Sequence, residues 1–216
     1  MVTIPTVLIL GAGASSMYGF PLGSELKQNI IQRLSQEGTA LYEQYSLMGF
    51  EQTLVKKFRD ALKQSGVKSI DAFLEHRKEF IEIGKTVIAE VLIPNENESN
   101  LFNSDSDWYG YLLDRLNSSP ENFDKNKLTI LTFNYDRSLE WYMFNAFQAR
   151  YGLTKQDAIQ VFNFVPVIHL YGSLGNLPWE EDCRPYSPLN DRPNIYLARD
   201  KIKIIHENII EDTEFN

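Results

Sequence analysis

Apolar residues in this chain follow two patterns, short unbroken runs and runs with helical spacing. The unbroken runs cover about residues 6–11, 128–134 and 165–171, and each gives way to a glycine or an asparagine. Short runs of this kind, rich in branched side chains, predict strands that are buried in a parallel sheet.

Helical spacing is clearest where Leu22, Leu26, Ile30 and Leu34 recur at every fourth position, which predicts an amphipathic helix that runs to Gly38. Further helices are predicted at about 54–62, at 108–116 and at 136–151, with a helical turn at 154–159. One more is predicted from an N-cap at Ser69 to Pro94. The last is an Ile-rich helix that contains Ile202, Ile205 and Ile209. The polar stretch 95–107 has no periodicity and predicts a surface loop or a flap.

Strands that alternate with helices predict an α/β fold, a Rossmann-like doubly wound parallel sheet. The helices of roughly 40–127 would form a cap inserted between the first and second strands. We expect one domain over 1–216, because a chain of 216 residues with 43% hydrophobic residues can bury one full core.

Composition narrows the class of protein further. A formal net charge of −8 argues against a general nucleic-acid surface and leaves at most a local patch around Lys56, Lys57 and Arg59. No run is long enough to span a bilayer and the first residues lack the features of a signal peptide, so we expect a cytoplasmic protein with no membrane contact. The single cysteine, Cys183, excludes an internal disulfide and a four-cysteine zinc site, and we expect it to pack rather than react.

The stretch from Val7 to Pro21 is the most informative part of the chain. An apolar run breaks into Gly11 and Gly13, and a helical pattern follows. Glycines at such a turn let the backbone approach a diphosphate, whose charge is met by free amides at a helix N-terminus. The turn therefore predicts a nucleotide site, although the same glycines also suit a plain strand-to-helix turn.

Four segments resemble the sirtuin superfamily. Gly-Ala-Gly-x-Ser followed by Gly-Phe-Pro at 11–21 is similar to its opening motif, and the run 128–136 is similar to its strand ending in Thr-x-Asn-x-Asp. The run 165–173 is similar to its next strand, where His-Gly-Ser usually stands, and 69–74 resembles a helix start of the bacterial sirtuin-like branch. Members of that branch commonly cleave NAD in antiphage defence.

The resemblance implies roles for individual residues. Asn134 would orient the ribose and the attacking water, Asp136 would hold the nicotinamide carboxamide, and Ser15 would support the phosphates or the ribose. The implied contacts to NAD come from Gly11, Ala12, Gly13, Ser15, Gly19, Pro21, Asp136, Gly172 and Ser173. From the residues alone, Asn134 also suits a strand end that bonds a loop, and Asp136 suits a helix N-cap.

The chain departs from the family at Tyr171, which stands where the family has its catalytic histidine. His169 comes two residues earlier, and alternating side chains would place both on one face, about 6 to 7 Å apart. His169 then either reaches the cleft as a catalytic group or is a buried histidine satisfied by a neighbour, and Tyr171 is a candidate contact to the ribose. His76 and His206 are expected on the surface or in the core.

A second departure lies at the C-terminus, because sirtuin-like chains continue into a further strand with a glycine-rich turn that receives the adenosine half. Either a further domain, a partner protein or a homo-oligomer completes the site, or binding is weak.

The leading function is hydrolysis of NAD to nicotinamide and ADP-ribose without a metal, in bacterial antiphage defence. This reaction suits the residues present because nicotinamide is already a cationic leaving group. The alternative is a catalytically inactive module that binds a nucleotide such as ADP-ribose, or a protein. A protein deacylase ranks third, since the zinc cysteines are missing.

Overall fold

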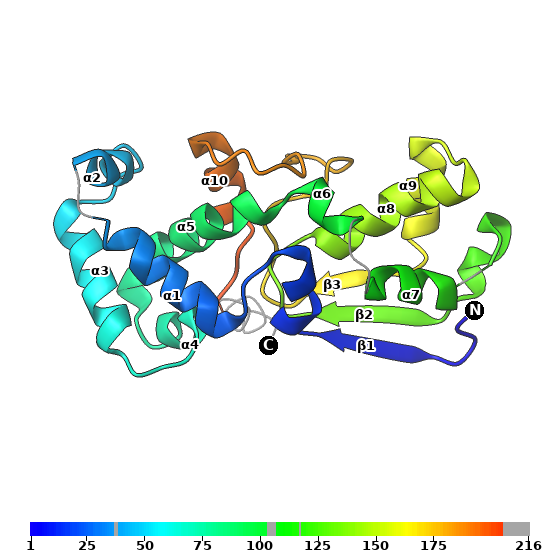
Figure 1. Ribbon diagram of the computed structural model, residues 1–216, viewed down its shortest axis with the longest axis horizontal. Helices are drawn as coiled ribbons and strands as arrows, with labels where there is room; N and C mark the ends of the chain where they lie inside the picture. Colours follow the sequence, from blue (N-terminus) through cyan, green and yellow to red (C-terminus); the bar gives the residue numbers. More distant parts are fainter. Residues whose placement is uncertain (37–38, 103–106, 117, 205–216) are drawn as a thin grey trace, which may run out of the picture.

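The structure, a computed structural model, describes residues 1–36, 39–102, 107–116 and 118–204. The molecule is elongated, with a parallel sheet and its covering helices at one end and a helical lobe at the other (Figure 1). It is a mixed α/β protein, as the alternation of apolar patterns predicts.

The described residues form a three-stranded parallel sheet in the order β1-β2-β3. The strands are β1 (Thr6–Leu10), β2 (Leu128–Thr132) and β3 (Val167–His169), so all three predicted strands are confirmed. In register, Leu10 pairs with Thr132 and Thr132 pairs with His169. β3 is shorter than predicted because the chain turns after His169 and Gly172 pairs with Ile202 in an antiparallel bridge.

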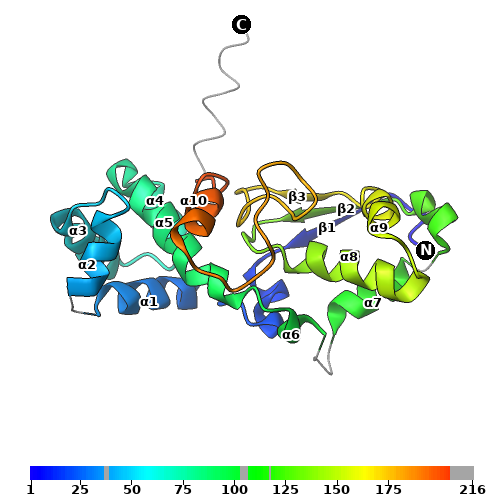
Figure 2. The same cartoon turned by 90° about the horizontal axis from the view of Figure 1, so that it is seen from above.

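The two faces of the sheet differ. On one face, Leu10, Thr132 and Val167 share a small void with side chains of α7 (Trp108–Arg115) and α8 (Ser138–Tyr151). On the other face, Val7 is 58% exposed and Ile9 is 64% exposed. Figure 2 shows α7 and α8 on one side of the strands and no described helix on the other. The expected doubly wound arrangement is therefore seen on one face only of the part that the structure describes.

The helical lobe is built from α1 (Gly23–Leu34), α2 (Thr39–Ser46), α3 (Gln52–Gln64), α4 (Ile70–Leu74) and α5 (Ile81–Leu92). A cluster of rings from Phe58, Phe73 and Phe80 fills its core, with centroids 5.5 to 6.0 Å apart. The later helix α10 (Arg192–Arg199) packs on α5. The helical lobe therefore differs from the predicted cap of residues 40–127. The lobe begins before residue 40, and α7, which lies within that range, covers the sheet instead.

The single helix predicted from Ser69 to Pro94 is wrong, because the chain breaks after α4 and restarts through a 3-10 turn, η3 (Lys78–Phe80). The N-cap is confirmed, since the Ser69 hydroxyl accepts a hydrogen bond from the Ala72 amide at 3.2 Å. The break lets α5 fold back onto α4 at Gly84, where a Cβ atom would lie 2.6 Å from the Leu74 side chain. Tertiary packing overrides a pattern that also suits one long helix.

Shorter elements complete the chain. They are η4 (Ile93–Asn95), α6 (Glu98–Leu101), η5 (Pro120–Lys125) and α9 (Lys155–Phe162). The loop predicted at 95–107 therefore contains a short helix, which is anchored by the fully buried Leu101. The predicted C-terminal helix is also misplaced: α10 ends at Arg199 and Ile202 lies in the bridge to Gly172, while Ile205 and Ile209 lie outside the described residues.

Three buried charges join the lobe to the sheet. The carboxylate of Glu96, which follows η4, accepts hydrogen bonds from Arg137 at 3.0 and 2.8 Å and one from Arg184. The side chains are at most 1% exposed. Arg137 also donates to the carbonyls of Asn176, Arg184 and Pro185. One carboxylate therefore pairs with two guanidinium groups away from water.

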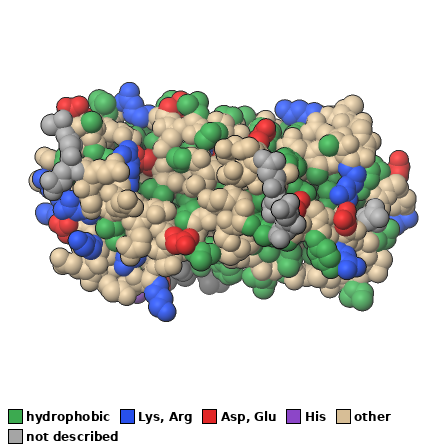
Figure 3. Space-filling model, viewed as in Figure 1, with side chains coloured by type: hydrophobic (Ala, Val, Ile, Leu, Met, Phe, Trp, Pro, Cys, Tyr) green, Lys and Arg blue, Asp and Glu red, His purple; other side chains and the backbone are tan. Residues whose placement is uncertain are grey.

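Among the described residues, no helix has the length and apolar character needed to cross a membrane. On the face drawn in Figure 3, acidic and basic side chains are interspersed. Arg59 is paired with the neighbouring Asp60, and Lys56 lies over the ring of Tyr42.

The buried cluster generates a prediction about stability. Glu96→Gln should lower the free energy of unfolding by about 3–5 kcal/mol, because two buried guanidinium groups would lose the carboxylate that pairs with both of them. Urea unfolding measures the change. The matched control is Asp114→Asn, which removes the partner of Arg150 in an exposed pair and should cost at most about 1 kcal/mol. Equal losses in the two variants would contradict the role assigned to Glu96.

Candidate functional site

The carboxyl ends of β1 and β2 meet at the glycine turn. The Phe133 amide donates to the Leu10 carbonyl at 3.0 Å and thereby fixes the end of β2 beside the end of β1. The turn then forms two short 3-10 helices, η1 (Ala12–Ala14) and η2 (Ser16–Tyr18). The predicted α-helix does not start at the turn but at Gly23, so the amides at the start of α1 are separated from the glycines by η1 and η2.

The turn nevertheless offers free hydrogen-bond donors. The Gly11 carbonyl accepts from the Ala14 amide at 2.8 Å, which closes η1. Within the described residues, the amides of Ala12 and Gly13 have no acceptor. Two successive free amides form a concavity of positive potential that suits an anion such as a phosphate.

Asn134 ties the two strand ends together. Its Nδ2 donates to the Gly11 carbonyl at 3.0 Å and to the Ser15 hydroxyl at 3.3 Å. Its own amide donates to the Thr132 hydroxyl at 3.1 Å. The first and second sequence motifs therefore meet through a side chain that was expected to belong to the site.

Asp136 is a buried carboxyl group at the start of α8. It accepts hydrogen bonds from the Ser138 amide at 3.2 Å and from the Ser138 hydroxyl. Burial raises the pKa of this carboxyl above its ordinary value, and hydrogen bonds from Ser138 and Ser15 oppose that shift only in part. Asp136 thus holds the first amide of α8, but the N-cap residue of this helix is Arg137 and not Asp136 as predicted.

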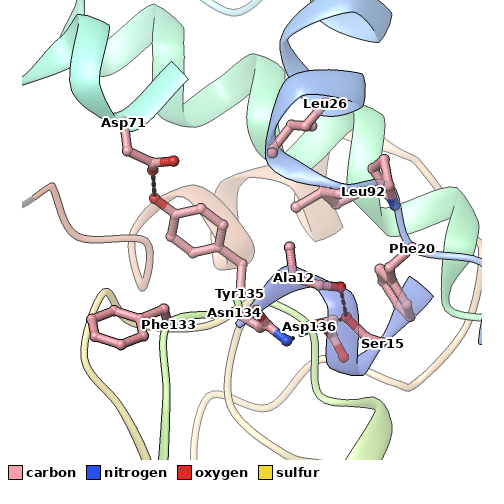
Figure 4. Close-up of a pocket in the computed structure, with 12 residues that line it drawn as sticks. Ala12, Ser15, Phe20, Leu26, Asp71, Leu92, Phe133, Asn134, Tyr135 and Asp136 are labelled. Atoms are coloured by element: carbon pink, nitrogen blue, oxygen red, sulfur yellow. Dashed lines mark hydrogen bonds between the residues drawn. The ribbon is translucent and has the colours of Figure 1, made fainter. Parts of the chain in front are cut away.

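A cavity of about 70 Å³ gathers these residues. Of the residues predicted to bind, it is lined by Ala12, Ser15, Pro21, Asn134 and Asp136. Figure 4 shows Leu26 and Leu92 of the helical lobe on one side and Ala12 and Asn134 on the other. The cavity therefore lies between the lobe and the strand ends.

Sequence reasoning assigned no role to two polar residues of this cavity. The Tyr135 hydroxyl donates to the carboxylate of Asp71 on α4, and both residues line the cavity (Figure 4). Burial raises the pKa of Asp71. The signal was present, since both residues lie inside the segments that carry the family resemblance, but only the fold brings them together.

His169 turns toward α8. Its Nδ1 lies 2.8 Å from the Asn134 carbonyl oxygen and its Nε2 lies 2.5 Å from a carboxylate oxygen of Glu140. Burial disfavours the charged ring, but the Glu140 carboxylate outweighs it, and the pKa of His169 rises to about 8. His169 lines a second cavity, of about 370 Å³, together with Glu140 and Ser173, and does not line the first.

Tyr171 does not share a face of β3 with His169, because the strand ends at His169. Its ring lies against the ring of Phe133 instead, with centroids 5.5 Å apart. Gly172 has a positive φ of 67°, and a Cβ atom there would lie 1.8 Å from the Lys201 carbonyl oxygen. The close approach of the chain at 201–203 accounts for this glycine.

The other candidates lie outside the first cavity. Gly19 ends η2 in the left-handed conformation with a φ of 94°. Cys183 is exposed, so the expected packing role is not seen, and His76 is also exposed. His206 lies outside the described residues. Over the described ranges, no group of three or more His, Cys, Asp or Glu side chains is arranged to hold a metal ion.

A scan against protein-family models, a search of curated proteins and a search of solved structures each found no match to this chain. The candidate site is a largely apolar cavity at the carboxyl ends of two parallel strands, with Ser15, Asn134 and Asp136 among its polar groups.

The buried Asp136 carboxyl group generates a prediction about pH. Folding raises the pKa of this carboxyl group above the ordinary value of 3.8. The protonated group therefore stabilises the folded state at a pH below 3.8, and this stabilisation is lost as the pH rises through the folded-state pKa. Asp136→Asn removes the titration and keeps an acceptor for Ser138. The melting temperature of the variant relative to wild type should therefore rise between pH 4 and pH 7. Parallel pH profiles would contradict the inferred direction of the shift.

Proposed function

We propose that this chain is a Rossmann-like, sirtuin-like domain that binds NAD at the cavity between the helical lobe and the ends of β1 and β2, and hydrolyses it. The single observation that carries the proposal is the Asn134 side chain, bonded at once to the Gly11 carbonyl and the Ser15 hydroxyl at the edge of a cavity shared with Asp136. Ligands of open parallel sheets bind beyond the carboxyl ends of the strands, which is where these groups converge.

The phosphates would be met by the free amides of Ala12 and Gly13. Among the described residues, no lysine or arginine lines the cavity, so main-chain donors would supply the attraction for the diphosphate. The carboxyl groups of Asp71 and Asp136 suit the ribose hydroxyls and the cationic nicotinamide end of the ligand.

The reaction breaks the bond between the ribose C1′ and the nicotinamide nitrogen. Nicotinamide leaves with the bonding electron pair, water adds at C1′, and one proton is released, which gives nicotinamide and ADP-ribose. Asn134 orients the ribose and the water, and Asp136 hydrogen-bonds the carboxamide. Positioning and electrostatic stabilisation suffice for such an oxocarbenium-like transition state.

The present cavity is too small for a dinucleotide, since pockets that enclose small ligands measure about 300 to 1,000 Å³ and this one measures about 70 Å³. Leu26 and Leu92 of the lobe close it against Ala12. Binding of a whole dinucleotide therefore requires this cavity to widen or the ligand to extend beyond it. By its resemblance, such a domain would act in antiphage defence, with a partner or a second copy completing the adenosine side.

One observation favours the second candidate, an inactive module that binds a nucleotide or a protein. Both ring nitrogens of His169 already have partners, and Tyr171 turns to Phe133, so neither presents a free base to the first cavity. Nicotinamide release from NAD by the purified protein separates the two candidates.

Asn134→Ala tests the catalytic assignment. We expect nicotinamide release to fall by a factor on the order of 10² or more, because the water and the ribose lose their orienting amide. The fold should persist, since the two lost hydrogen bonds contribute about 1 kcal/mol each.

The matched control is Asn145→Ala, which removes an amide that donates to the Trp141 carbonyl at 2.7 Å on α8, away from the cavity. Wild-type turnover in a folded Asn134→Ala protein would remove Asn134 from the mechanism.

Gly11→Val tests the phosphate turn. A Cβ atom at Gly11 meets nothing within 4 Å, and its φ of −125° is open to any residue, so the variant should fold. A branched side chain would stand where the diphosphate approaches, and NAD affinity should fall at least about tenfold, or 1.4 kcal/mol. Calorimetry with NAD measures the change, with Thr6→Val on the same strand as control. Unchanged affinity would place the ligand elsewhere.

A further inference from the structure

His169 lies between two groups that only accept hydrogen bonds. A carbonyl oxygen, that of Asn134, faces Nδ1, and a carboxylate oxygen of Glu140 faces Nε2. A neutral imidazole has one donor nitrogen and one acceptor nitrogen, so it can satisfy only one of these partners. To form both hydrogen bonds, His169 and Glu140 together must carry one proton more than a neutral imidazole and an ionised carboxylate.

We propose that His169 is a positioning residue whose doubly protonated ring, paired with Glu140, clamps the main chain of Asn134 and so aims the Asn134 side chain at Gly11 and Ser15. The chain of contacts is continuous: Glu140 to His169, His169 to the Asn134 carbonyl, and the Asn134 amide group to the first motif. The link to a ligand rests on the proposed function, whereas the clamp itself does not.

The surroundings of the ring favour the charged form. The side chain of His169 is 13% exposed and that of Glu140 is 5% exposed, so solvent screens the pair little. Asp136 adds a second negative charge nearby. Arg137 and Glu180 also line the cavity beside the ring, but Arg137 is engaged by Glu96 and by main-chain carbonyls.

The clamp predicts a pH dependence opposite in sign to that of a catalytic base. A general base must be neutral, so activity would rise with pH through the pKa of His169. A clamp must be charged, so activity and affinity fall as the pH rises through the same value of about 8. Between pH 7 and pH 9 the protonated fraction of such a ring drops about tenfold.

Two substitutions separate the contacts of the ring. His169→Asn places a permanent amide donor near the position of Nδ1 and keeps the contact to the Asn134 carbonyl. His169→Gln places its donor near the position of Nε2 and keeps only the contact to Glu140. Glu140→Gln removes the charge that raises the pKa of His169. His76→Asn, at an exposed histidine, is the control.

The first measurement needs no ligand. Nuclear magnetic resonance of histidine-labelled protein follows the ring of His169, assigned by its loss in His169→Asn, while the amides of Gly11 and Ser15 report on the site. We expect a ring midpoint near pH 8, lower in Glu140→Gln, and amide shifts with the same midpoint in wild type but not in His169→Asn. A ring that is neutral at pH 7, or amides that ignore its titration, would overturn the clamp.

The second measurement is NAD affinity and nicotinamide release from pH 6 to pH 9.5. We expect wild type and His76→Asn to lose about tenfold between pH 7 and pH 9, His169→Asn to be independent of pH in that range, and His169→Gln to be weak throughout. Activity that rises with pH in wild type and disappears in His169→Asn would show a general base instead. If wild type neither binds nor cleaves NAD at any pH, the proposed function fails, and the amide shifts alone decide the clamp.

Discussion

The buried carboxylate of Glu96 is the contact on which the geometry of the site depends most. It fixes Arg137, and Arg137 is the residue between Asp136, which lines the cavity, and α8, which carries Glu140. All the guanidinium donors of Arg137 are used, on Glu96 and on three carbonyls of the segment 176–185. A planar guanidinium group with a fixed fork of donors can hold several chain segments at once, which a lysine could not. The end of α5, the turn after β2 and the loop after β3 are thus joined at one point.

Around that point, the site is a set of contacts between strand ends that lie far apart in the sequence. Asn134 uses its side chain for the first motif and its carbonyl for His169, so one residue connects β1, β2 and β3. Buried polar groups are costly unless they are bonded, and here the bonds of each group fix the next.

The sheet itself leaves one face of apolar side chains uncovered in the described part of the chain. Ile9, Leu131 and Ile168 form a row across the three strands on that face, with Ile9 and Ile168 exposed. Parallel sheets are normally covered on both faces. In the described part of the chain, this row lacks the cover that parallel sheets usually have.

The sequence by itself determined the elements whose signals are local. Three apolar runs predicted the three strands, the spacing from Leu22 to Leu34 predicted α1, and the N-cap at Ser69 predicted the start of α4, because strand and helix periodicity and capping act between near neighbours. The resemblance of its motifs to those of the sirtuin superfamily also singled out Asn134, Ser15 and Asp136, and the strand ends of the parallel sheet bring these three residues together. Tertiary structure decided the rest. The break before α5 follows from the close packing of α5 on Leu74. The contacts of His169 with Glu140 and of Tyr135 with Asp71 join residues that no periodicity relates. The separation of Tyr171 from His169 follows from the bridge between Gly172 and Ile202. Long-range contacts of this kind depend on which elements lie side by side, and that order is a property of the whole fold.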